Sequence, residues 1–254
     1  MLIKEFYLNR SKLIIDLGII TVLIMTVYLI SLKTDSTIGM IIFVIFMVPM
    51  HVFYIPLFLF YSLHAETKQH QIWLYNPNSP LLLFLPKFTI ALLGMLESLL
   101  ITGVFSLYVI QVAKKEFELP KELLGDLIVP TSMIVGGSLV FTSIYLGIVA
   151  MFFWSLFQVI KKYFKKLTWV AIIACFGFVS WILYEFEKTG FFSKLTNWGK
   201  VKSPLLDSYS VSVSNSQLFI DSGQLVFGYI LYEIILAVIM IFLSKWMIDR
   251  KVEV

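Results

Sequence analysis

Hydrophobic residues follow one another along this chain in long blocks, and short polar stretches separate the blocks. A helix needs about 20 mainly apolar residues to cross a bilayer. Six blocks meet that length: residues 13–32, 38–61, 88–112, 127–157, 168–186 and 225–247. We therefore predict an all-α integral membrane protein, with the 254 residues forming a single transmembrane domain of six helices.

The second block carries residues that interrupt a helix. Pro49 and Pro56 lie inside it, on either side of His51. Proline lacks a backbone N–H, and membrane helices tolerate it because neighbouring helices and local adjustments satisfy the freed carbonyl groups. We expect a kink in this span.

Composition and charge agree with a membrane protein and set its orientation. Hydrophobic residues make up 59% of the chain and charged residues 14%, and the mean hydropathy is +0.89. Loops that stay in the cytoplasm retain Lys and Arg close to the spans. Arg10, Arg250 and the cluster at residues 161–166 fall on one side, together with both termini. We predict a membrane protein with cytoplasmic N- and C-termini. Its net charge of +4 is expected to favour contact with membrane lipids and not with nucleic acid.

The first 12 residues have two contrasting faces when drawn as a helix. The apolar face carries Leu2, Ile3, Phe6 and Tyr7, and the polar face carries Glu5, Asn9 and Lys12. This pattern is typical of a helix that lies in the membrane interface. We expect an N-terminal interfacial helix at residues 1–12, and the alternative is an extension of the first span.

The polar stretch between spans two and three is the most distinctive part of the sequence. Residues 64–80 begin with a pattern that suits a short helix, and the run Asn76 to Pro80 then stops that helix and turns the chain. The next span begins after Pro86 and Lys87. A short helix that ends in a fixed turn can transmit force to the spans on both sides.

These residues give the chain a family resemblance. The loop pattern is carried by Glu66, Thr67, Leu74, Pro77, Ser79 and Lys87, and flanking motifs occur at Lys4-Glu5-Phe6, Asn9-Arg10-Ser11 and Trp246 to Arg250. In these features the chain resembles the permease subunits of ABC-2 type exporters. The resemblance covers the whole architecture but rests on short motifs.

The resemblance implies a cytoplasmic coupling helix between spans two and three, which contacts a separate ABC ATP-binding subunit. The implied contact residues are Glu66, Thr67, His70, Trp73, Tyr75, Asn76 and Pro77. The sequence contains no Gly-x-x-x-x-Gly-Lys-Ser/Thr run to cradle phosphates. ATP and Mg would therefore bind to the partner subunit, and we expect no cofactor and no catalytic residue in this chain.

The same resemblance implies the remaining partners. ABC-2 permeases work in pairs, so we expect a second copy of this chain or a paralogue. Members that export short toxin peptides suggest an amphipathic peptide, or other hydrophobic cargo, as the substrate. Export as the direction of transport also rests on this analogy.

Three polar residues inside the spans are candidates for a translocation path. His51, Glu97 and Glu233 lie at membrane depth, where ionisable groups are costly and face the bundle or a water-filled route. The glutamates would attract cationic side chains of a peptide, with His51 hydrogen-bonded to one of them. The alternative is that all three only join helices together, which contributes about 1 kcal/mol per hydrogen bond.

The fourth span has a face of small residues. Ser132, Gly136, Ser143 and Gly147 stand at spacings that place them on one narrow side of a helix. Small residues let two helices approach closely. This small-residue face predicts either a seam between two permease protomers or a contact within one bundle.

One region leaves two structural alternatives open. The stretch 187–224 mixes polar residues with Phe191, Phe192 and Trp198, which suggests short helices that dip into the outer leaflet or an ordinary surface loop.

An intramembrane enzyme would need clustered ligands or a nucleophile with its base. His64 and His70 are six residues apart, unlike a helical zinc pair, and Cys175 is alone, so we predict no metal site. A motor-independent carrier, channel or immunity protein stays as the alternative function.

Overall fold

A computed structural model describes residues 2–67, 80–117, 121–164, 167–202, 210–213, 216–219 and 224–249. The helices are α1 (Leu2–Thr34), α2 (Ile38–Met50), the 3₁₀ turn η1 (His51–Phe53), α3 (Tyr54–Thr67), α5 (Pro80–Glu116), α6 (Lys121–Phe164), α7 (Thr168–Glu187), α8 (Gly190–Thr196) and α9 (Phe227–Met247).

The predicted number of spans is confirmed. Within the described residues, six helical stretches are long and apolar enough to cross a membrane: Leu2–Thr34, Ile38–Ala65, Leu82–Glu116, Ser132–Tyr163, Thr168–Glu187 and Phe227–Met247. Many of their large apolar side chains point outward, such as Leu100 at 68% and Val104 at 69% exposed. Such surfaces suit contact with lipid tails, which are as apolar as leucine.

The predicted interruption of the second span is present. α2 stops at Met50, one turn of 3₁₀ helix follows, and α3 begins at Tyr54. Pro49 and Pro56 cannot donate to the preceding turns, so regular α-helical bonding fails here. The Ile55 backbone N–H finds its partner outside its own helix, in the Ser143 hydroxyl of α6, at 3.3 Å.

The N-terminal region differs from the expected separate interfacial helix. α1 runs without a break from Leu2 to Thr34, so residues 2–12 extend the first span. The helix has the predicted apolar and polar faces in this region. It does not stop near Lys12, because the sequence there has no glycine or proline that would end a helix. The open alternative of a continuous helix is therefore the one observed.

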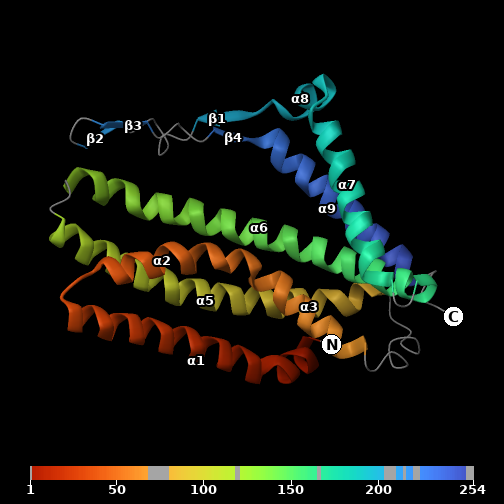
Figure 1. Cartoon of the computed structure of the whole chain (residues 1–254), viewed down its shortest axis with the longest axis horizontal. Coiled ribbons are helices and arrows are strands. Elements are labelled where there is room, and N and C mark those ends of the chain that lie inside the picture. The colour runs from red at the N-terminus through yellow and green to blue at the C-terminus, as the bar shows by residue number, and fades with distance from the viewer. Residues whose placement is uncertain are drawn as a thin grey trace.

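Helices α1, α2, α5 and α6 lie along the long axis of the molecule (Figure 1). α1 packs on α5, and α3 packs on both α5 and α6. α7 and α9 both contact α6 and lean away from it, and α8 joins them at their far end. The start of α1, the end of α3, the start of α5 and the ends of α6 and α9 gather at the same end, which we call the terminal end. An even number of spans predicts this placement of the two termini.

In its described part, the stretch 187–224 contains one short helix and strands that the sequence did not predict. α8 begins after Thr189, whose hydroxyl accepts a hydrogen bond from the Phe192 N–H at 3.2 Å. Strand β1 (Lys200–Lys202) pairs antiparallel with β4 (Gln224–Val226), and β2 (Ser210–Val213) pairs antiparallel with β3 (Ser216–Phe219). Insertion of this region into the outer leaflet stays a prediction.

Candidate functional site

The terminal end holds both sides of the predicted coupling segment. α3 ends with Glu66 and Thr67 in its last turn, and α5 begins at Pro80. The predicted contact residues His70, Trp73, Tyr75, Asn76 and Pro77 lie outside the described residues. We call residues 60–67 and 80–88 the two stems, because they connect residues 68–79 to the bundle.

An apolar cluster fixes both stems to the rest of the bundle. Leu63 of α3 and Phe84 of α5 are 0% and 2% exposed, and they pack with Met151, Trp154 and Ile248. The rings of Phe84 and Trp154 meet edge to face, with centroids 6.2 Å apart. Truncating a side chain in such a core costs several kcal/mol because neighbours fill the void only partly. Both stems are therefore packed directly against α6 and the end of α9.

A buried ion pair attaches the second stem to α1. The Lys87 ammonium lies 2.9 Å from Glu5 Oε1, and the two side chains are 2% and 14% exposed. Removing one partner of a buried pair leaves an uncompensated charge, which is strongly destabilising. Lys87 is the residue at which the resemblance placed the start of the third span, and its partner lies in the N-terminal motif.

The same polar network reaches the first stem through two more residues of α1. The Asn9 amide donates to the Glu5 carbonyl oxygen at 2.9 Å and lies 3.3 Å from Glu5 Oε2. Lys12 donates to Asn9 Oδ1 at 3.2 Å, and its ammonium lies 4.2 Å from the centroid of the Tyr61 ring in α3. We call Glu5, Asn9, Lys12, Tyr61 and Lys87 the terminal clamp. It connects α1 to both stems.

Part of the predicted translocation path is corrected by the contacts of His51. This side chain is buried, and its Nδ1 lies 2.9 Å from the Met47 carbonyl oxygen. Nδ1 must donate to that carbonyl, so in the neutral ring Nε2 accepts from the Ser98 hydroxyl at 2.8 Å. The expected hydrogen bond between His51 and a glutamate is therefore wrong, and His51 joins η1 to α5.

The two glutamates of the predicted path lie on different helices. Glu97 is exposed on α5, and Glu233 is half-buried on α9. In the part of the chain that the structure describes, no hydrogen bond or ion pair connects them with His51 or with each other. A common path lined by these glutamates therefore stays a prediction. The described residues also contain no group of three or more His, Cys, Asp or Glu side chains that could hold a metal ion.

Another polar contact at membrane depth was not predicted. The Tyr54 hydroxyl donates to Asp16 Oδ2 at 3.3 Å and so joins α3 to α1. Gly94 of α5 makes room for it, because a Cβ there would lie 2.5 Å from the Tyr54 hydroxyl oxygen. Tyr54 and Asp16 are 38 positions apart in the sequence, and no local pattern signals such a pairing.

The small-residue face of α6 is divided into two parts. Ser143 is 0% exposed, and a Cβ at Gly147 would lie 2.7 Å from Ile55 Cγ2 and 3.1 Å from Phe88 Cε1. This half packs against α3 and α5 of the same chain. Ser132 and Gly136 instead line an apolar groove of 780 Å³ between α2, α5 and α6, with Val48 and Leu99 among its walls.

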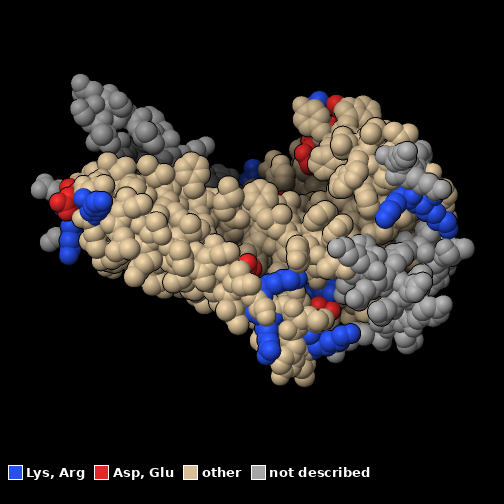
Figure 2. Space-filling model, turned by 60° about the horizontal axis from the view of Figure 1, so that its bottom comes forward, with Lys and Arg blue, Asp and Glu red and all other residues tan. Residues whose placement is uncertain are grey.

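Charged side chains gather in separate zones of the surface. On the face drawn in Figure 2, Lys and Arg lie at the left end, in the lower middle and at the right, and the wide surface between the left end and the middle is almost free of charge. At the end opposite the termini, the Thr37 hydroxyl bonds to the Glu116 carboxylate. An uncharged band between two charged zones is what a protein that crosses a bilayer presents.

The fold and these surfaces define the class: the chain is a multi-pass membrane protein with six apolar helices. No family model matches it, and no solved structure matches it. The chain is similar to an uncharacterized protein, YhcE, of Bacillus subtilis (strain 168), with 24% identity over 187 residues, which is 73% of this chain and 70% of that protein.

Proposed function

We propose that the chain is the permease subunit of an ATP-driven ABC-2 type exporter in a bacterial cell membrane. A separate ATP-binding subunit would contact residues 64–80 from the cytoplasm, with Glu66, Thr67, His70, Trp73, Tyr75, Asn76 and Pro77 at the contact. That subunit binds ATP and Mg and hydrolyses the nucleotide, and this chain has no catalytic residue of its own.

The observation that carries the proposal is the attachment of both stems. Leu63 and Phe84 are buried in one cluster with α6 and α9, and Lys87 is paired with Glu5 of α1. An ordinary surface loop has no need of such anchoring, since connecting segments are usually the more mobile parts of a protein. Anchored stems would transmit a displacement of residues 68–79 to three further helices, α1, α6 and α9.

The proposed mechanism follows from this attachment. ATP binding closes a pair of motor subunits, and their movement displaces the coupling segment. The stems carry the displacement through the Leu63–Phe84 cluster to α6 and α9 and through the terminal clamp to α1. The bundle then changes from a state open to the cytoplasm to one open to the outside, and hydrolysis resets it.

The proposed cargo is a short amphipathic peptide or another hydrophobic molecule. The length of the chain and its Ile- and Lys-rich, Arg-poor composition resemble the longer permease of the phenol-soluble-modulin exporter. Glu97 and Glu233 would meet cationic side chains of such a peptide on a path completed by a second permease copy or a paralogue. His51 is left out of this path because Ser98 and the Met47 carbonyl occupy both ring nitrogens.

Photo-crosslinking tests the contact with the motor. A photoreactive amino acid is placed at Trp73 in one variant and at Tyr75 in another, with Trp198 as the control because it lies in the opposite stretch between α7 and α9. We expect irradiated native membranes to yield an adduct with a nucleotide-binding protein from positions 73 and 75 and none from 198. If neither position 73 nor position 75 formed an adduct, the result would favour a motor-independent carrier, channel or immunity protein.

A further inference from the structure

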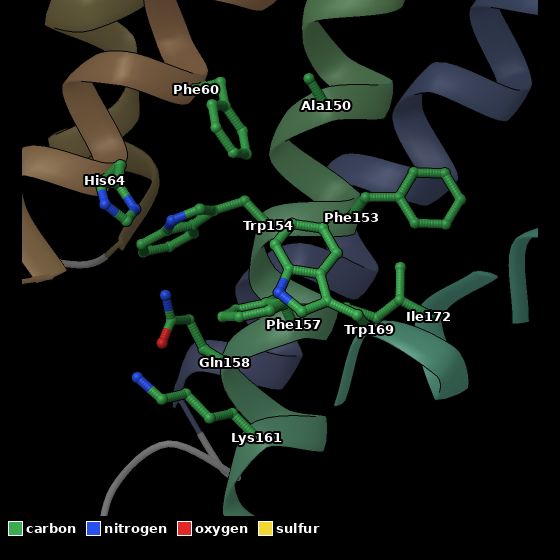
Figure 3. A pocket seen from close by; sticks show the side chains of 10 residues that line it. All are labelled: Phe60, His64, Ala150, Phe153, Trp154, Phe157, Gln158, Lys161, Trp169 and Ile172. Atoms are coloured by element: carbon green, nitrogen blue, oxygen red, sulfur yellow. The ribbon is translucent and has the colours of Figure 1, made fainter. Parts of the chain in front are cut away.

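A pocket at the terminal end is separate from the clamp and from the apolar groove. It has a volume of 340 Å³ and lies between α3, α6 and α7. Figure 3 shows that Phe153, Trp169 and Ile172 lie on one side of it, while His64, Gln158 and Lys161 place their nitrogen atoms toward the other. The pocket thus has an apolar part and a polar part, which suits an amphiphile.

The polar part lies where α6 leaves the apolar zone. Lys161 is in the last turn of this 44-residue helix, about 12 Å along the axis from Phe153 at 1.5 Å per residue. Trp169 and Tyr163 are 60% and 65% exposed beside it. Exposed Trp and Tyr at the end of a membrane helix mark the level of the lipid headgroups. The pocket therefore extends from headgroup level into the depth of the acyl chains.

The charge at this level is positive. Lys161 and Lys162 follow one another at the end of α6, and among the described residues no carboxylate forms an ion pair with Lys161. His64 stacks on Phe60 with an interplanar angle of 11°, which holds its ring at the edge of the pocket. Lys, Gln and His all donate hydrogen bonds, and three donors at one end suit an anionic oxygen-rich group.

We infer that this pocket binds an anionic phospholipid, with the phosphate at Lys161, Gln158 and His64, one acyl chain against Phe153 and Ile172, and Trp169 at the boundary between headgroup and acyl chain. Basic pockets between membrane helices recognise anionic headgroups in this way. The aromatic walls favour a lipid over a free anion, because a soluble phosphate would leave the apolar part of the pocket unused. Phe60 and His64 belong to the first stem, and His64 also begins the segment assigned to the motor contact. Lipid binding by the purified chain is still independent of the proposed function, because it needs no motor subunit.

The test is native mass spectrometry of the whole purified protein with added lipid. The probes are dioleoyl phosphatidylglycerol and dioleoyl phosphatidylcholine, which share acyl chains and differ in net charge. The wild type is compared with Lys161→Gln and with the matched control Lys162→Gln, which makes the same change one residue further along α6, outside the pocket lining. A third variant, Ile172→Trp, fills the apolar part.

We expect the wild type and Lys162→Gln to retain phosphatidylglycerol about fivefold more than phosphatidylcholine, the effect of about one basic residue at a membrane surface. Lys161→Gln should lose this preference. Ile172→Trp should lower retention of both lipids, which provides a second measurement if Lys161→Gln does not fold.

Three results would overturn the inference. The first is a phosphatidylglycerol preference that survives Lys161→Gln, and the second is an equal loss in Lys161→Gln and Lys162→Gln, which would indicate general surface charge. The third is binding of a soluble anion in place of a lipid. In that case inorganic phosphate alone would raise the melting temperature of the protein as much as phosphatidylglycerol does, and Ile172→Trp would leave this increase unchanged.

Discussion

The two halves of α6 are held in different ways. Near the terminal end, Ser143 and Gly147 are in close contact with α3 and α5, and Met151 and Trp154 join the cluster that fixes both stems. Toward the opposite end, Ser132 and Gly136 line an open apolar groove of 780 Å³. One helix therefore has a rigid half, which packs on α3 and α5 and borders the smaller pocket of 340 Å³ on another side, and an open half, which borders the larger groove.

This difference indicates how a force applied at the coupling segment could move the helices of the bundle. Tight packing transmits displacement because cores are close-packed and resist compression. Space beside a helix lets it change position without a steric clash. The rigid half lies at the coupling segment, and the open half lies away from it, which is the arrangement that force transmission from one end requires.

The largest predicted effect comes from breaking the terminal clamp. Lys87→Ala should lower the free energy of unfolding by about 3 kcal/mol, because it removes the cation 2.9 Å from the largely buried carboxylate of Glu5. The measurement is denaturant unfolding of the purified protein in detergent micelles. The control is Lys188→Ala, since the pair of Lys188 with Glu185 at 3.1 Å is half-exposed, at 51% and 49%, and should contribute less than about 1 kcal/mol.

A double variant sharpens this prediction. Replacing both Glu5 and Lys87 by Met removes the unpaired charge and should restore most of the lost stability. Equal losses in Lys87→Ala and Lys188→Ala would show that the clamp is no stronger than a surface pair.

The next prediction compares the two halves of α6 by making the same change, Gly to Ala, once in each half. Gly147→Ala places a Cβ 2.7 Å from Ile55 Cγ2, so crowding should lower the free energy of unfolding by about 1–2 kcal/mol. Gly136→Ala meets its nearest atom, Leu99 Cδ2, at 3.9 Å, and should stabilise the protein by up to about 1 kcal/mol through helix propensity. Thermal unfolding of both variants side by side measures the difference. If both changed stability in the same direction, the division of α6 would be contradicted.

The smallest effect concerns the interruption of the second span. Ser143→Ala removes the partner of the Ile55 N–H and should cost about 1 kcal/mol. Ser138→Ala is the matched control, because that exposed hydroxyl donates to the Val135 carbonyl oxygen of its own helix and should change stability by less than about 0.5 kcal/mol. The same unfolding assay applies, and equal values would remove the role given to Ser143.

Features set by local chemistry could be predicted from the sequence. The length of each apolar block determines whether a helix spans a bilayer, and the missing N–H of Pro49 and Pro56 interrupts the second span. An even number of spans places both termini at one end. These predictions needed no knowledge of which helix packs on which.

Features set by packing between distant residues could not be predicted. Glu5 was assigned to the polar face of a short interfacial helix, and nothing local connects it with Lys87, 82 positions away. The contact of His51 with Ser98 depends on how η1 lies against α5. The small-residue face gave no sign that Ser143 and Gly147 would pack while Ser132 and Gly136 line a groove. Strands β1 and β4 pair across 24 residues, and neither segment has an alternating pattern long enough to signal it.

The most direct measurement of the proposed function is purification of the tagged chain from native membranes in mild detergent, followed by an ATPase assay and mass spectrometry of the eluate. Pro77→Ala is purified in parallel, because a change at the coupling segment should release the motor while leaving the permease in the membrane. We predict a co-purified ATP-binding subunit with ATPase activity that falls in Pro77→Ala. The absence of ATPase activity from the wild-type eluate in several mild detergents would contradict an exporter permease.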